Sequence, residues 1–277
     1  MALLSYEFMI RAFLAGIFIA GIAPMLGVFL VIRRQSLMAD TLSHVSLAGV
    51  ALGFFLNLNP TATTLLVVVI AAIIMEYLQN MYSSYSEISI AILMAAGLAI
   101  ALVLMKLAPG SSAVSIQSYL FGSIITVTWP QVGFLGALFV LVSILFLLFK
   151  RPMYVLTFDE DIAAVDGLPV RLMSMIFNVV TGVAIAVMIP IAGALLISAI
   201  MIVPAATGMR AGKSFNAVIL ISVIIGLVGI ISGLTGSFYM DIPPGATITL
   251  CFIGLFLLMN VFRRVKMMLQ RKRNQND

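Results

Sequence analysis

Asp40 and His44 are the residues of this sequence best suited to bind a ligand, and they lie four positions apart in an apolar stretch. Residues i and i+4 of an α-helix share a face, so the carboxylate and the imidazole would point the same way. Carboxylate oxygen and imidazole nitrogen are good ligands for divalent metals such as zinc and manganese. Two ligands leave a zinc shell incomplete, and water, Ser43 or a second subunit would supply the rest.

Three interpretations of this pair are open from the residues alone: a metal contact, a proton relay, or a buried ion pair that only fixes helix packing. An aspartate inside a membrane span costs about 2.5–3.5 kcal/mol on insertion scales, so something must offset that cost. Glu76, near the inner end of a predicted span, either lines a pathway or reaches the membrane interface. An enzyme is disfavoured, because His44 is the single histidine and has only Ser43 as a neighbouring nucleophile, on the wrong helical face.

The composition indicates an all-α, polytopic membrane protein. Of the 277 residues, 63% are hydrophobic and only 9% are charged, whereas soluble domains carry roughly 45–50% and about 25%. The pI near 9.6 does not indicate a nucleic-acid partner, because the basic residues form no stripe. One cysteine, Cys251, excludes a disulfide within the chain.

Nine apolar segments are long enough to span a bilayer within one membrane domain, 1–277. Polar breaks separate them, and they cover 8–32, 35–56, 61–80, 88–107, 130–149, 172–189, 191–209, 214–237 and 245–262. The stretch 114–128 is polar for a span and fits a short surface or re-entrant helix. Two glycine pairs, Gly49 with Gly53 and Gly229 with Gly233, have the spacing that lets membrane helices approach closely.

The positive-inside rule orients these spans. If Arg33 and Arg34 are cytoplasmic, every basic residue except Arg11 and Lys106 also falls inside. The carboxyl end, with its basic tail 263–277, is then cytoplasmic, and nine spans place the amino end outside.

The longest inner loop, 150–171, has the pattern of a short helix. Thr157 or Asp159 is a candidate N-cap, acidic residues follow in the first turn, and Gly167 can end the helix. A loop of this length is long for a plain connection, so it is either a docking element or a solvated loop.

Three segments resemble the ABC-type zinc and manganese permeases. They are Ser36-Leu-Met-Ala-Asp40-Thr-Leu-Ser-His44 with Leu47-Ala-Gly49 following, Phe158 to Pro169, and Pro204-Ala-Ala-Thr207. Together with the order of spans, the resemblance covers essentially the whole chain. Each segment alone is weak, and their combination is specific.

The resemblance implies a type II ABC importer-like permease of about nine helices in the bacterial inner membrane. It implies a homodimer, a cytoplasmic ABC ATPase dimer that hydrolyses ATP, and an extracellular metal-binding lipoprotein or periplasmic binding protein. Zinc would be the cargo and no cofactor would be bound. Asp40 and His44 would line the translocation path. The ATPase-docking residues carried over from the family are Phe158, Asp159, Glu160, Asp161, Asp166, Gly167, Leu168 and Pro169.

The sequence around His44 is more similar to that of zinc permeases than to that of manganese permeases. Manganese relatives tend to have Ile-Ser-His-Ala-Val-Leu-Pro-Gly at this place, and Ser46-Leu-Ala48 departs from that pattern. Two alternatives stay open: a manganese ABC permease, and a proton-coupled secondary carrier in which Asp40 and His44 form the relay.

Overall fold

The structure is a computed structural model that describes residues 6–82, 86–107 and 122–273. The described residues form helices and no strand, as the composition predicts. The elements in chain order are α1 (Glu7–Ile32), α2 (Leu37–Leu56), α3 (Pro60–Met81), α4 (Ser86–Leu107), η2 (Ile124–Thr126), α6 (Trp129–Phe158), α7 (Glu160–Val165), α8 (Val170–Ala192), α9 (Ala194–Ala211), α10 (Phe215–Met240) and α11 (Pro244–Arg273).

Nine helices in the described part of the chain are long and apolar enough to cross a membrane, which confirms the nine predicted spans. Large apolar side chains are exposed on several of them, as with Leu66 on α3, Phe134 and Leu147 on α6, and Leu250 on α11. In a membrane such surfaces face lipid, so their exposure carries none of the cost it would have in water.

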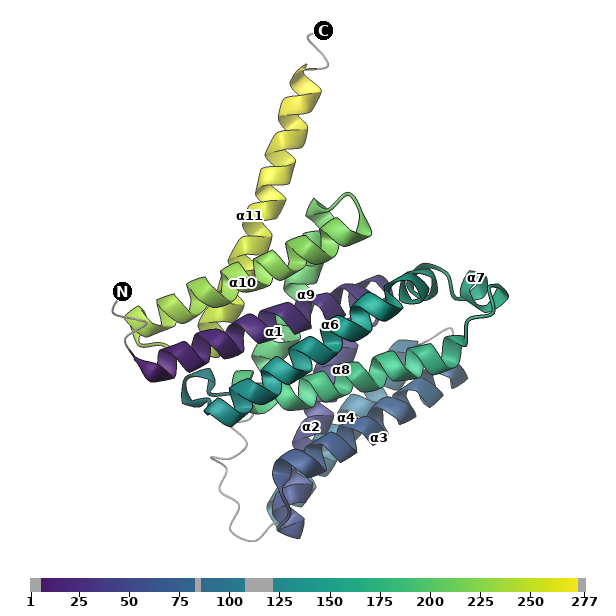
Figure 1. Cartoon of the computed structure of the whole chain (residues 1–277), viewed down its shortest axis with the longest axis vertical. Coiled ribbons are helices and arrows are strands. Elements are labelled where there is room, and N and C mark those ends of the chain that lie inside the picture. Colours follow the sequence, from purple (N-terminus) through teal and green to yellow (C-terminus); the bar gives the residue numbers. More distant parts are fainter. Residues whose placement is uncertain (1–5, 83–85, 108–121, 274–277) are drawn as a thin grey trace.

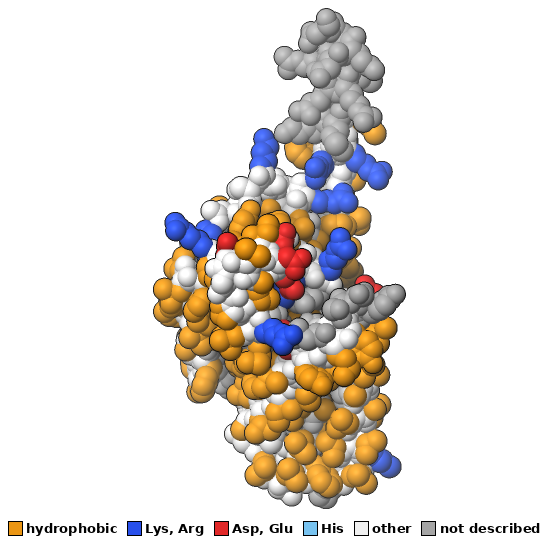
Figure 2. Space-filling view, turned by 90° about the vertical axis from the view of Figure 1, so that its right-hand side faces the viewer, with side chains coloured by type: hydrophobic (Ala, Val, Ile, Leu, Met, Phe, Trp, Pro, Cys, Tyr) orange, Lys and Arg blue, Asp and Glu red, His pale blue; other side chains and the backbone are white. Residues whose placement is uncertain are grey.

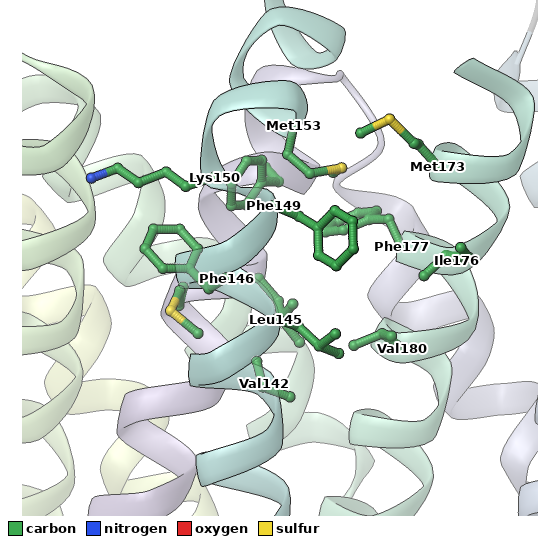
Figure 3. A pocket seen from close by; sticks show the side chains of 13 residues that line it. Val142, Leu145, Phe146, Phe149, Lys150, Met153, Met173, Ile176, Phe177 and Val180 are labelled. Atoms are coloured by element: carbon green, nitrogen blue, oxygen red, sulfur yellow. The ribbon is translucent and has the colours of Figure 1, made fainter. Parts of the chain in front are cut away.

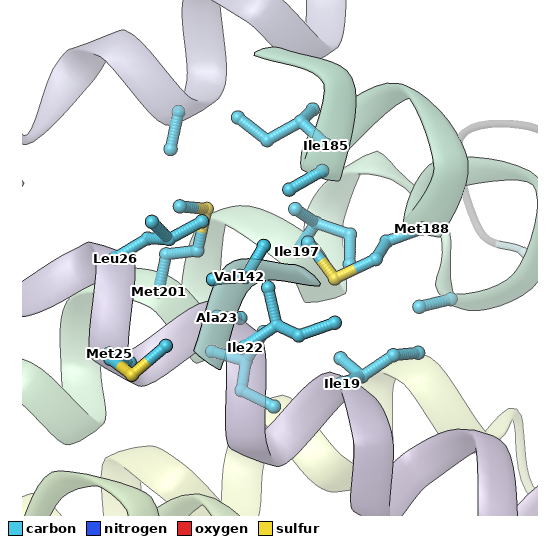
Figure 4. Close-up of a cluster of buried hydrophobic side chains, with 14 of the residues drawn as sticks. Ile19, Ile22, Ala23, Met25, Leu26, Val142, Ile185, Met188, Ile197 and Met201 are labelled. Carbon is cyan, nitrogen blue, oxygen red and sulfur yellow. The ribbon is translucent and has the colours of Figure 1, made fainter. Parts of the chain in front are cut away.

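Helix α1 forms the centre of the bundle, and 72% of the residues in its 18-residue apolar segment are buried. It packs against α6, α9 and α10, and Figure 1 shows α1 running between α6 and α10. Figure 4 shows Ile19, Ile22 and Leu26 of α1 in one cluster of buried side chains with Ile185 of α8 and Ile197 of α9. Helix α1 therefore contacts both α8 and α9, the helices that carry Ser174 and Ser198, which are described below.

The two predicted glycine pairs lie at close helix contacts. A Cβ atom at Gly49 would press on the backbone of Thr64 in α3, and one at Gly233 would press on Ile248 in α11. Glycine lets helix backbones approach this closely. Helix α2 is thereby held tightly against α3, and α4 packs on it as well.

Gly193 separates α8 from α9 and has a φ of 84°. Glycine populates positive φ without the steric cost that other residues meet there. The chain can therefore end α8 at Ala192 and start α9 at Ala194 with a single residue between them. This sharp connection brings the first turns of α9 against α2.

One predicted boundary is wrong. The span predicted at 130–149 continues as α6 to Phe158, so the inner loop shortens to the residues around α7. The predicted loop began at Lys150, but Met153 and Leu156 are buried and continue the apolar face of the helix. The predicted tail 263–277 is helical to Arg273, with 274–277 outside the described residues. The stretch 114–128 was predicted to form a short surface or re-entrant helix. Residues 114–121 lie outside the described residues, and residues 122–128 contain only the short helix η2.

Candidate metal centre

Asp40 and His44 share one face of α2, as their spacing predicts. Nε2 of His44 lies 3.8 Å from Oδ2 of Asp40. That separation is longer than a hydrogen bond, so the two atoms are not bonded to each other and both can reach a common ligand. Nδ1 of His44 is buried without a hydrogen-bond partner in the described part of the chain. Nε2 is therefore the imidazole nitrogen that faces the carboxylate.

Ser198 of α9 is the third polar group at this place. Its hydroxyl oxygen lies 3.2 Å from Oδ1 of Asp40 and 3.1 Å from the carbonyl oxygen of Ala194. The hydroxyl can therefore donate to the carboxylate and fix one of its two oxygens, which leaves Oδ2 directed towards His44. The sequence gives no local signal for Ser198, because 158 positions separate it from Asp40.

The site is partly open in a single chain. The side chain of Asp40 is 42% exposed and that of His44 is 25% exposed. Within the described residues, no three His, Cys, Asp or Glu side chains gather where they could hold a metal ion. A carboxylate, an imidazole and a hydroxyl leave a zinc shell open, so water or a second chain would complete it. An open shell of this kind is typical of a site that exchanges its ligands and not of a closed structural zinc site.

Ser43 does not join this site, although the sequence made it a candidate. Its side chain is fully buried, and its hydroxyl donates to the carbonyl of Ala39 at 2.8 Å. The hydrogen bond is internal to α2, which satisfies a hydroxyl in an apolar environment.

Glu76 lies in a separate buried cluster between α3 and α8. Its side chain is enclosed by the protein, since the residue is only 9% exposed. Oε2 accepts hydrogen bonds from Ser174 Oγ at 2.9 Å and from Asn178 Nδ2 at 2.7 Å. These donors stabilise a carboxylate that would otherwise be costly to bury. Neither Ser174 nor Asn178 was singled out from the sequence.

Arg33 connects this cluster to the inner loop. One guanidinium nitrogen lies 2.7 Å from Ser174 Oγ and 3.1 Å from Glu160 Oε1. The Arg33 side chain is 6% exposed and that of Glu160 is 60% exposed. The sequence marked Arg33 only as a cytoplasmic charge, and the structure buries it under α7.

The predicted short helix in the inner loop is α7. Asp159 is its N-cap, and its side chain accepts from the amide of Ile162 at 3.0 Å, whereas Thr157 bonds back to Met153 within α6. Gly167, with a φ of 78°, follows the helix as predicted. Asp159, α7 and Gly167 therefore form one compact, capped unit.

The outer surface of this unit mixes acidic and apolar side chains. Ala163 is buried beneath it, whereas Phe158, Ile162 and Val165 are 58%, 54% and 88% exposed. The other exposed residues of the segment 158–169 are Asp159, Glu160, Asp161, Ala164, Asp166, Gly167 and Pro169, and Leu168 is half-buried. Figure 2, which views the side of the molecule carrying α7, shows charged side chains gathered there above a broad apolar surface.

An apolar cavity of about 90 Å³ lies between α1, α6 and α8. Phe149, Met153 and Phe177 line it, and Figure 3 shows Lys150 extending from the other side of α6. The lining contains neither a carboxylate nor an imidazole. The cavity thus offers no ligand to a hard or borderline cation.

Comparison with known proteins places this architecture in a family. The profile of the ABC 3 transport family matches residues 5–263. The high-affinity zinc uptake system membrane protein ZnuB of Haemophilus influenzae is 29% identical, over 95% of this chain and 100% of that protein. The manganese transport system membrane protein MntC of Halalkalibacterium halodurans is 28% identical, over 92% of this chain and 87% of that protein.

The fold is also similar to a solved structure. PsaBC from Streptococcus pneumoniae, solved in complex with a Fab, superposes with a TM-score of 0.82 at 27% identity, over 93% of this chain and 92% of that chain. The family profile and the fold agree on the same class of transport membrane subunit. This chain is a multi-pass membrane protein that belongs to the ABC 3 transport family.

Proposed function

We propose that this chain is the permease subunit of an ATP-driven importer of divalent metal, with zinc as its substrate. The observation that carries the proposal is the Asp40–His44 pair, whose Oδ2 and Nε2 atoms face each other on one side of a membrane helix. Imidazole and carboxylate together suit zinc. The similarity to the zinc uptake system membrane protein ZnuB supports the same substrate.

A homodimer fits the open side of this site. Asp40 remains 42% exposed in one chain, and a second copy or water can supply the ligands that one chain lacks. The position of the basic residues supports a cytoplasmic carboxyl end in the bacterial inner membrane. A binding protein on the outer face would deliver the ion.

The ATPase would dock on the surface formed by α7 and its flanking residues. The apolar side chains of Ile162 and Val165 are exposed beside several acidic residues, and the helix is fixed by its own N-cap. Exposed apolar side chains bordered by polar ones resemble the apolar core and polar rim of a protein interface. No cofactor is proposed for this chain, and ATP hydrolysis is assigned to the partner.

Manganese is the second candidate substrate. The MntC relative supports it at nearly the same identity as ZnuB. Carboxylate oxygen also suits manganese, although zinc binds more tightly to most sites of this composition.

The test is metal uptake into metal-starved cells that produce this chain together with its ATPase. Zinc uptake that requires the ATPase and resists excess manganese supports the proposal. Uptake blocked by manganese would change the substrate and keep the architecture. Zinc uptake without the ATPase would overturn the importer and favour the proton-coupled carrier.

The docking surface gives a further prediction. Val165→Asp places a charge in the most exposed apolar position of α7. Burying an unpaired charge at an interface is costly, and a cost of about 1.4 kcal/mol or more would lower ATPase recovery at least about tenfold. The measurement is co-purification of the ATPase with tagged permease. The melting temperature of the permease should not change, since Val165 is 88% exposed. Full ATPase recovery with the variant would refute the docking surface.

A further inference from the structure

The turn between α1 and α2 is fastened to three other elements of the described structure. Arg33 bonds to Glu160 of α7 and to Ser174 of α8. Gln35 donates from Nε2 to Oε1 of Gln79 in α3 at 3.2 Å, and both of these residues are buried. Helix α2, with Asp40 in its first turn, starts directly after this turn.

These bonds form a continuous path from the protein surface to the bundle interior. Glu160 is exposed on α7 and accepts from Arg33, which also donates to Ser174. Ser174 in turn donates to Glu76, which also accepts from Asn178. Each donor–acceptor distance along this path lies between 2.7 and 3.1 Å. Hydrogen bonds in such a chain reinforce one another in a low-dielectric interior.

Arg33 is the one member of this path that joins the surface to the interior. Its guanidinium carbon also lies 5.9 Å from the centre of the Phe177 ring, so the side chain is held on three sides. Because the Arg33 side chain is only 6% exposed, little water can replace its partners, and breaking its buried contacts is costly. A displacement of α7 must therefore either break the Arg33–Glu160 pair or move the turn with it.

The geometry points to Arg33 as a positioning residue that transmits movement of α7 to the metal site on α2. This inference rests on the proposed function, because α7 moves only if an ATPase docks there. Arg33 touches no metal and acts through the turn that carries Asp40. Its neighbour Arg34 is exposed and supplies a matched control of the same residue type.

The experiment uses the complete transporter in lipid vesicles and measures zinc transported per ATP hydrolysed. Arg33→Gln keeps donor groups and removes the charge, and it should lower this ratio about tenfold, the effect expected when a strongly coupled pair is lost. ATPase recovery should be retained, since the apolar docking residues are unchanged. Arg33→Lys should restore part of the ratio, and Arg34→Gln should leave it unaltered.

Glu160→Gln provides a second variant that does not depend on the folding of a buried mutant, because Glu160 is 60% exposed. If the pair transmits movement, the Arg33→Gln, Glu160→Gln double variant should be no worse than the more severe single variant. Effects that add, or a transport-to-hydrolysis ratio that equals wild type in both single variants, would overturn the inference. Failure of the wild-type protein to take up zinc with ATP would instead refute the proposed function.

Discussion

Asp40→Asn is expected to abolish zinc uptake while leaving the protein folded. The substitution keeps the volume of the side chain and an oxygen that Ser198 can reach, but it removes the charge that faces His44. Loss of even an outer partner of a metal site costs roughly 10–100-fold in affinity or activity, so loss of the carboxylate itself should cost at least about 100-fold. The measurement is ATP-dependent zinc uptake at matched amounts of permease.

Asp241→Asn is the matched control for this variant. Asp241 is exposed and has a φ of 52°, a left-handed conformation that asparagine also adopts readily. The same chemical change should therefore leave uptake at the wild-type rate. His44→Ala should fail as Asp40→Asn does. Normal uptake by Asp40→Asn would remove the metal centre from this helix face.

Gly27→Ala is expected to give the largest loss of stability among single methyl additions. A Cβ atom at residue 27 of α1 would overlap the backbone carbonyl of Met201 in α9. A backbone group cannot turn aside as a side chain can, so α1 and α9 must separate. Overpacking of a tight core costs about 1–3 kcal/mol, and here the cost should reach or exceed the upper value.

The measurement for Gly27→Ala is the thermal unfolding of purified permease, together with its yield. Gly133→Ala is the control, because a Cβ atom at Gly133 of α6 would meet nothing within 4 Å. That variant should be neutral or more stable by roughly 0.5–1 kcal/mol, since alanine favours the helix. Equal melting of Gly27→Ala and wild type would show that α1 and α9 do not pack as closely as described.

Local chemistry explains what could be predicted for the inner loop. A helix cap needs only a side-chain oxygen a few positions before an amide, and Asp159 supplies it for α7. The end of α6 was predicted wrongly because tertiary packing outweighed the local signals. Lys150 and Pro152 are local signals for an end, but burial of Leu156 against the rest of the bundle overrode them.

The sequence by itself determined the nine spans and the common face of Asp40 and His44, because both follow from short-range rules. Hydropathy over about 20 residues defines a span, and a separation of four residues defines a helix face. Only the tertiary structure brought Ser198 to Asp40 and placed Arg33 between Glu160 and Ser174. These contacts join residues more than 120 positions apart, and their formation depends on how helices pack, which no local pattern of residues specifies.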